Sequence, residues 1–213
     1  YTTLFRSWYA GQQADYAARP TGQARPETNA ALASLAPTLA GRVPLLFLTG
    51  DNLNMLRAAR LAAEFQLPAL LVGSGHEYQR LDALKALNLP IFLPVDFPPA
   101  PKLKNAGDER AVDTADLRHW ALAAANPGVL EKAGLRFALT ADDLKEPQEF
   151  RGKVREAIAR GLSADRALAA CTSDAAALLG VADRVGTVEA GKVASLVVVK
   201  GDLFGEKSEI RAV

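Results

Sequence analysis

Four short apolar runs, each followed by a stretch of helical periodicity, make up the middle of this chain. The runs cover residues 43–48, 69–72, 91–93 and 136–140. Continuous apolar runs of this length are typical of strands buried on both faces of a sheet. After the first run, apolar residues recur at helical spacing and predict an amphipathic helix over residues 52–65. Alternating buried strands and helices predict right-handed βαβ units and a parallel sheet.

Further elements are predicted on both sides of this alternating region. Pro26 stands where a first helical turn tolerates proline, which predicts a helix over residues 26–39. Ser163 is a good N-cap for a helix over residues 164–170. The β-branched run at residues 195–199 predicts a strand that leaves the main body. The chain therefore divides into a helical lead-in segment (1–42), a region of four βα units (43–193) and the strands of a small outlying β domain (194–213).

Composition narrows the choice of partners. The 213 residues carry a formal net charge of +1 without a run of Lys and Arg, so we expect neither nucleic acid nor a membrane as partner. No apolar run approaches the roughly 20 residues of a membrane-spanning helix, and we expect a soluble protein, either cytoplasmic or exported. The single cysteine, Cys171, excludes an internal disulfide and a multi-cysteine zinc site. Its alanine-rich surroundings favour a buried, inert thiol over a nucleophile.

The C-terminal part of the chain carries a distinctive order of residues. Residues 171–176 read CTSDAA, residues 179–180 read LG, residues 186–192 read GTVEAGK and residues 194–198 read ASLVV. This order resembles the C-terminal signature of the amidohydrolase superfamily, the imidazolonepropionase-like and related metal-dependent hydrolases. The Asn-Pro pair that is usual in the family is replaced by Asp174-Ala175, and Ser195 stands in place of an Asp.

The resemblance extends over residues 43–213 and implies an α/β fold. The family has a (β/α)8 barrel, which takes about 250 residues, together with a small β domain. The four βα units therefore resemble the second half of a TIM-type barrel, strands five to eight, followed by part of a small β-sandwich appendage. We expect the chain to be one piece of a longer protein. Because half a barrel leaves sheet edges unpaired, we expect the remainder of the same polypeptide or a homo-oligomer partner to cover them.

The resemblance also implies a metal-dependent reaction. In the family, histidines at strand ends and an Asp after the eighth strand bind one or two divalent ions, and the Asp shuttles a proton. Asp142, directly after the fourth apolar run, matches this Asp as metal ligand and catalytic residue, with zinc as the expected ion. The positions that match the fifth- and sixth-strand histidines hold Thr49 and Gly73. A hydroxyl and a glycine cannot replace two imidazoles in a zinc site.

Each candidate residue also has a simpler interpretation. Asp142 suits an N-cap of the following helix. His76 either reaches toward Asp142 from its loop or is an ordinary histidine at a helix start, and His119 beside Trp120 suits a packed helical side chain better than a ligand. The two histidines are far apart in sequence and lack ligand spacing. The GSG of residues 73–75 follows a strand and could hold a phosphate through backbone N–H groups, but it lacks a complete phosphate-loop motif.

Two functions of different class follow. The first is hydrolysis of carbon–nitrogen bonds other than peptide bonds in a small-molecule substrate, with a divalent metal as cofactor and Asp142 as the surviving ligand. The second is a catalytically degenerate amidohydrolase-like domain that binds no metal and has a structural or ligand-binding role. The residues at positions 49 and 73 favour the second function for this segment. The family resemblance favours the first, by analogy of fold.

Overall fold

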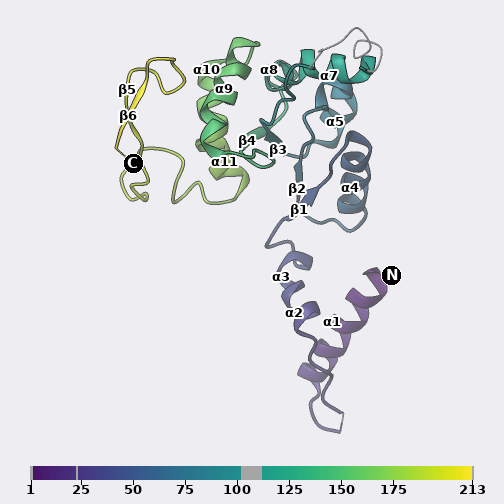
Figure 1. Cartoon of the computed structure of the whole chain (residues 1–213). Coiled ribbons are helices and arrows are strands. Elements are labelled where there is room, and N and C mark those ends of the chain that lie inside the picture. Colours follow the sequence, from purple (N-terminus) through teal and green to yellow (C-terminus); the bar gives the residue numbers. More distant parts are fainter. Residues whose placement is uncertain (1, 23, 102–111, 213) are drawn as a thin grey trace. The chain divides into compact units, whose positions relative to one another are not determined.

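The computed structural model describes residues 2–22, 24–101 and 112–212 (Figure 1). The chain forms two compact units. The first comprises Tyr1–Leu45 with Ala62–Pro68, and the second comprises Leu46–Leu61 with Ala69–Val213. The first unit contains α1 (Thr2–Ala18), α2 (Ala30–Ser34) and α3 (Ala36–Leu39).

The helix expected over residues 26–39 forms only in part. It begins at Ala30, because the side chain of Asn29 accepts a hydrogen bond from the backbone N–H of Leu32 at 3.1 Å. This is the usual way in which an asparagine caps a helix N-terminus. The prediction that Pro26 opens the helix was therefore wrong, since a capping side chain nearer the apolar residues fixes the start instead.

The second unit is built on a four-stranded sheet of order β1-β2-β3-β4. The strands are β1 (Leu45–Leu48), β2 (Ala69–Val72), β3 (Ile91–Pro94) and β4 (Phe137–Thr140). β2 pairs with β3 and β3 pairs with β4 in parallel, as predicted. All residues of β2 are buried, whereas β1 is only partly buried at alternate positions and exposes Leu46 and Leu48, so the expected burial on both faces does not hold for β1. The continuous apolar runs therefore predicted the strands to within two residues at either end.

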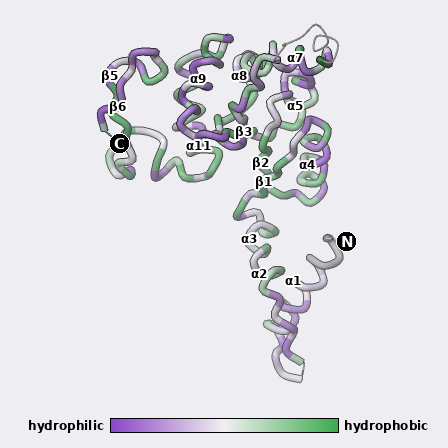
Figure 2. The backbone as a smooth tube through the Cα atoms, in the orientation of Figure 1, coloured by the Kyte–Doolittle hydropathy of each residue, from purple (hydrophilic) through white to green (hydrophobic). Residues whose placement is uncertain are grey.

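Helices alternate with these strands along the chain. They are α4 (Asn52–Glu64), α5 (Leu81–Leu87), α7 (Thr114–Ala123), α8 (Asn126–Lys132), α9 (Phe150–Ala159), α10 (Ala164–Cys171) and α11 (Ser173–Leu178), with the 3-10 turns η1 (Glu77–Gln79) and η2 (Pro147–Glu149). The strands contribute Leu71, Leu93 and Phe137, all fully buried, to the core between sheet and helices. Figure 2 shows the hydrophobic colouring of this central region. The predicted cap is confirmed, because Ser163 Oγ accepts the N–H of Arg166 at 3.2 Å.

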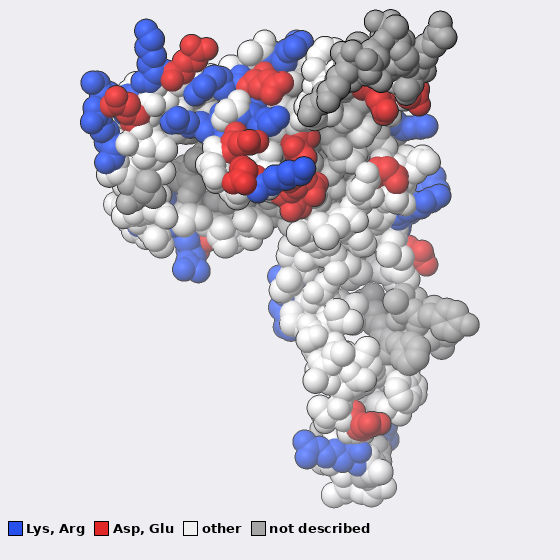
Figure 3. Space-filling model, in the orientation of Figure 1, with Lys and Arg blue, Asp and Glu red and all other residues white. Residues whose placement is uncertain are grey.

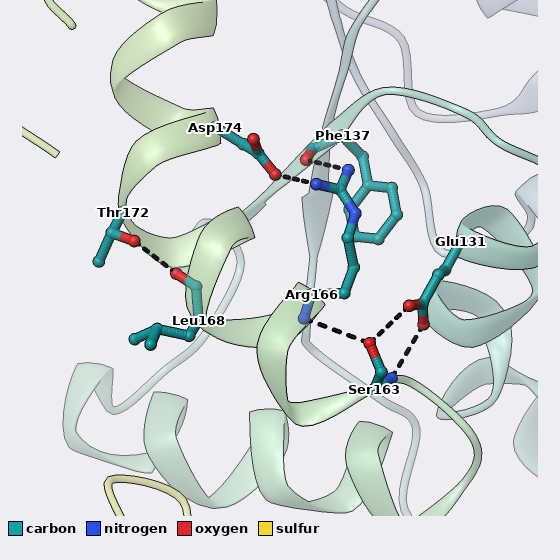
Figure 4. A network of polar contacts seen from close by, with 7 residues as sticks. All are labelled: Glu131, Phe137, Ser163, Arg166, Leu168, Thr172 and Asp174. Carbon is teal, nitrogen blue, oxygen red and sulfur yellow. Dashed lines mark hydrogen bonds and ion pairs between the residues drawn. The ribbon is translucent and has the colours of Figure 1, made fainter. Parts of the chain in front are cut away.

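A network around Arg166 attaches α10 and α11 to β4 (Figure 4). The Arg166 guanidinium forms an ion pair with Asp174 and donates to the carbonyl oxygen of Phe137 at 3.1 Å. It also lies over the Phe137 ring, 4.4 Å from its centroid. Nearby, Ser163 Oγ donates to Glu131 at 2.5 Å. The Asp that replaces the usual Asn at position 174 thus has a structural reason, since it neutralises a half-buried arginine.

The predicted outlying strand pairs with the end of the described chain. β5 (Val198–Lys200) and β6 (Glu209–Ala212) form an antiparallel hairpin with an irregularity between Val198 and Val199. Its connecting turn contacts α9, where Arg155 Nε donates to the carbonyl oxygen of Phe204 at 2.7 Å and Nη2 donates to that of Gly205 at 3.1 Å. Phe204 is buried in the core of the unit. These contacts hold the hairpin against the βα region.

The surface of the second unit is of mixed charge. In the view of Figure 3, Lys and Arg side chains are interspersed with Asp and Glu side chains over this unit. Such mixing is expected of a chain with a net charge of +1. Within the described residues, no helix combines the length and apolar character needed to cross a membrane.

Candidate functional site

The carboxyl ends of β1, β2 and β4 carry the residues that the sequence singled out. Parallel strands of an α/β sheet place these ends at one edge, where binding sites of such folds form. Thr49 follows β1, Gly73 follows β2 and Asp142 lies two residues beyond β4. His76 and Glu77 continue the loop after β2 into η1.

Glu77 is the best-connected polar residue of this edge. Its side chain is fully buried, and its Oε1 accepts the backbone N–H of Ser74 at 2.6 Å. Its Oε2 accepts Asn126 Nδ2, also at 2.6 Å. A buried carboxylate is tolerated only when its oxygens are hydrogen-bonded in this way. Glu77 therefore fixes the loop after β2 to the start of α8.

The hydrogen bonds of Glu77 argue against a phosphate site in the loop after β2. The sequence left open that the GSG of residues 73–75 holds a phosphate through backbone N–H groups, although it lacks a complete motif, but the Ser74 N–H is already donated to Glu77. The negative carboxylate beneath the loop opposes the approach of a second anion. This loop is consequently organised around an internal anion, its own glutamate.

Two asparagines extend this polar cluster. Asn126 Oδ1 accepts the backbone N–H of Tyr78 at 2.8 Å, so that both ends of its amide are used. Asn52, at the start of α4, donates from Nδ2 to the carbonyl oxygen of His76 at 2.8 Å. Its Oδ1 is buried and has no hydrogen-bond partner among the described residues. Asn52 and Asn126 thus hold η1 from two different helices.

His76 and His119 are brought together by the fold. Their rings are stacked, with centroids 3.6 Å apart and planes inclined by 11°. His76 Nδ1 lies 3.1 Å from the carbonyl oxygen of Ser74, and His119 Nδ1 lies 3.4 Å from the Tyr78 hydroxyl. This contact could not be predicted from the sequence. Nothing in the spacing of the two histidines indicates that α7 packs against the loop after β2.

The electrostatic environment of His119 follows from this stack. Burial lowers its pKa, and the neighbouring His76 lowers it further, whereas Asp116 acts in the opposite direction. Stacked rings cannot direct two ring nitrogens at one common ion in the manner of paired zinc ligands. The pair is therefore a contact between elements, and the interpretation of His119 as a packed helical side chain agrees with its position.

The two strand-end positions that lack histidine are filled by the protein itself. Thr49 is buried, and its Oγ1 donates to the carbonyl oxygen of Val72 at 2.6 Å. A Cβ atom at Gly73 would lie 2.6 Å from Glu77 Oε1 and 3.3 Å from Ile91 Cγ2. Separations below 3.0 Å are not adopted by real Cβ atoms. No side chain larger than hydrogen fits at position 73 while Glu77 keeps its place.

Asp142 occupies an exposed turn after β4. Its backbone N–H donates to Thr140 Oγ1 at 3.1 Å, and the turn closes with the N–H of Leu144 bonded to the carbonyl oxygen of Ala141 at 3.1 Å. The next helix, α9, begins at Phe150 with Glu149 at its N-cap position. The capping interpretation of Asp142 was therefore wrong, because several residues separate it from the helix. Its role as metal ligand and catalytic residue stays a prediction.

The donor groups near Asp142 do not fit the family's metal. Within the part of the chain that the structure describes, no group of three or more His, Cys, Asp and Glu side chains lies close enough to hold an ion. Asp142 and its neighbour Asp143 are both exposed carboxylates without nitrogen ligands. A catalytic zinc site takes three protein ligands and leaves one position open.

Cys171 behaves as the sequence predicted. The thiol lies half-buried at the end of α10, and burial raises its pKa to about 11. At neutral pH the sulfur is therefore protonated, and the thiolate that a nucleophile requires is scarce.

Comparison with known proteins supports the fold and the family. An amidohydrolase from Thermotoga maritima MSB8 has a similar structure, with a TM-score of 0.71 and 22% identity over 98% of this chain and 52% of that chain. A second solved amidohydrolase gives a TM-score of 0.59 and 16% identity over 82% of this chain and 42% of that chain. The chain thus spans about half the length of these structures. No curated protein sequence matches it.

The structural likeness confirms the expected partial barrel. The described sheet is one part of the TIM-type barrel of the similar proteins, and it is not closed among the residues that the structure describes. In addition, residues 121–213 match the model of the amidohydrolase family. This matched range includes the C-terminal signature. Residues 121–213 therefore resemble the amidohydrolase family, and the structural likeness over most of the chain shows the shared fold.

Proposed function

We propose that this segment is a catalytically degenerate amidohydrolase-like half barrel with a structural or ligand-binding role. The observation that carries the proposal is the closure of the two strand-end positions. Thr49 is tied to Val72, and Gly73 is covered by the carboxylate of Glu77. A histidine at position 73 would have to displace a carboxylate held by two short hydrogen bonds. The packing is thus adapted to the absence of histidine.

The donor set around Asp142 supports the same proposal. A lone carboxylate lacks the imidazole ligands that zinc takes in catalytic sites. No reaction step through a metal follows from the described residues. The open edges of the sheet, β1 and β4, are suited to pair with the other half of a barrel. In this proposal the other half comes from the same polypeptide or from a second copy.

One observation favours a second function, hydrolysis of a carbon–nitrogen bond other than a peptide bond by an imidazolonepropionase-like enzyme. Asp142 stands after β4, at the same edge of the sheet as Gly73, where the family places its catalytic Asp. It is exposed and makes no side-chain hydrogen bond within the described residues. In that case the remaining ligands would have to be supplied by another part of the assembled protein.

Metal content decides between the two proposals. The chain, assembled with the part of the protein that supplies the other half of the barrel, is incubated with zinc, dialysed and subjected to elemental analysis, alongside Asp142→Asn and, as a matched control, its exposed neighbour Asp143→Asn. The degenerate half barrel is expected to contribute no zinc ligand, so the zinc content should be the same in all three proteins. Near-stoichiometric zinc that is lost in Asp142→Asn and kept in Asp143→Asn would overturn it in favour of the hydrolase.

A further inference from the structure

A cavity of about 590 Å³ lies between η1 and α7. Its lining residues are Tyr78, Gln79, Arg80, Ala115, Arg118 and Leu122. Small-molecule sites in proteins have volumes of about 300–1,000 Å³, so the space suits a small ligand. It involves none of the residues discussed for metal binding or catalysis.

Two arginines give this cavity its charge. Arg80 follows η1, Arg118 lies on α7, and both side chains are exposed. Within the described residues, neither guanidinium has a hydrogen bond or an ion pair, although other arginines of this unit, such as Arg155 and Arg166, are engaged. Two unpaired guanidinium groups on one cavity attract an anion and are less repelled by each other once it is bound.

Within the described residues, no acidic residue forms an ion pair with either arginine. No carboxylate is among the residues that line the cavity in the described part of the chain. Glu77 is buried, and its oxygens are engaged by Ser74 and Asn126. Asp116 lies on α7 between two lining residues, Ala115 and Arg118, yet it does not line the cavity itself. The lining is therefore positive, whereas the unit as a whole mixes both signs.

The wall of the cavity is held in place before any ligand arrives. The Tyr78 backbone N–H is bonded to Asn126 at 2.8 Å, and its hydroxyl contacts His119 Nδ1 and Gln79 Nε2, each at 3.4 Å. The stack of His119 on His76 adds a further constraint. Groups that are fixed beforehand lose little conformational entropy on binding, which favours affinity. The phenol, the Gln79 amide and the apolar Leu122 supply additional contacts for a ligand.

We propose that this cavity binds a small anion that carries a carboxylate or a phosphate group, and that Arg80 and Arg118 recognise it. The guanidinium fork matches both groups through paired N–H···O bonds. The inference goes beyond the proposed function and holds whether or not the segment retains a metal. It assigns the ligand to the η1–α7 side of the unit, separate from the turn of Asp142.

The test is calorimetric titration of the whole chain with inorganic phosphate and, separately, with succinate, at constant ionic strength and neutral pH. We expect saturable binding of at least one of the two anions. Loss of a charged bidentate contact weakens binding by about tenfold or more, so Arg80→Gln and Arg118→Gln are each expected to show this loss. Arg60→Gln on α4 removes an exposed arginine away from the cavity lining and should bind as the unchanged protein does.

The outcomes are distinct. Phosphate binding alone identifies a phosphate-bearing ligand, and succinate binding alone identifies a carboxylate-bearing one. Absence of saturable binding of either probe would overturn the proposal, as would equal losses in Arg60→Gln and in the two cavity variants. The side-chain Nε–H NMR signals of Arg80 and Arg118, assigned from the variants, should shift on titration. Circular dichroism verifies that each variant is folded.

Discussion

The imidazole rings of His76 and His119 lie in face-to-face contact, with centroids 3.6 Å apart. One ring belongs to the loop after β2 and the other to α7, so the contact joins two elements that are distant in sequence. Two positive charges at this separation repel each other. The stack is therefore most stable while at least one ring is neutral, and this gives the contact a dependence on pH.

His119 is expected to titrate below the ordinary histidine pKa of about 6.5. The causes are burial and then the charge of His76, which together outweigh Asp116. His76→Phe keeps an aromatic ring in the stack but removes its charge, so the pKa of His119 should rise in that variant. NMR titration of the Cε1–H signal, assigned with His119→Gln, measures the pKa of His119 in the unchanged protein and in His76→Phe. A midpoint of His119 at or above that of a free histidine would contradict the prediction.

The same shift has a consequence for stability. Because the pKa of His119 is lower in the folded than in the unfolded chain, the unfolded chain binds more protons between the two values. The contribution of His119 to stability is complete above about pH 6.5 and is lost as the pH falls toward its folded pKa. Urea unfolding across this range should show a decrease that is smaller in His119→Gln. An equal decrease in both proteins would assign it to other groups.

Gly73→Ala tests whether the strand-end position is closed. The new Cβ would meet Glu77 Oε1 at 2.6 Å, and that oxygen is held by Ser74. Overpacking of this kind costs about 1–3 kcal/mol, which urea unfolding would detect. Gly152→Ala is the matched control, because this helical glycine has open space around its Cβ position. That variant should be neutral or slightly stabilised. Equal stability of Gly73→Ala and the unchanged protein would show that Glu77 moves aside.

Asp174→Asn restores the residue that is usual in the family and removes the charge paired with Arg166. We expect a loss of about 1–3 kcal/mol in the free energy of unfolding, because the half-buried guanidinium loses the carboxylate that pairs with it directly and keeps only the charge of Glu131 nearby. Asp165→Asn, an exposed Asp in the first turn of α10, serves as the control and should cost under about 1 kcal/mol. A loss no larger in Asp174→Asn than in Asp165→Asn would mean that the ion pair contributes nothing.

Arg155→Met removes the hydrogen bonds to the carbonyl oxygens of Phe204 and Gly205 while keeping the length of the side chain. The hairpin of β5 and β6 should then open more readily. Its amide hydrogens should exchange faster than in the unchanged protein, whereas the exchange of those in β3 should not change. Hydrogen exchange followed by mass spectrometry resolves the two segments. Arg151→Met is the comparison, since Arg151 makes one longer contact, at 3.3 Å to Ser208. Faster exchange in both segments would instead indicate a global loss of stability.

The sequence alone determined the arrangement of elements in the βα region. Continuous apolar runs and helical stripes depend on local burial, so β2, β4 and the cap at Ser163 could be predicted from neighbouring residues. The C-terminal signature also predicted a resemblance to the amidohydrolase family, which the match over residues 121–213 supports. Composition and residue spacing could not predict the contacts of the site, because they contain no information on which loops lie next to each other.

Tertiary structure alone decided which side chains share an environment. The sequence does not distinguish Glu77 from the other charged residues. In the structure it is fully buried, holds η1 and leaves no space for a side chain at position 73. The stack of His76 on His119 and the pairing of Asp174 with Arg166 likewise depend on contacts between separate elements. The physical reason is that burial and hydrogen bonding of polar groups are set by the packing of distant segments, whereas secondary structure is set largely by the local pattern.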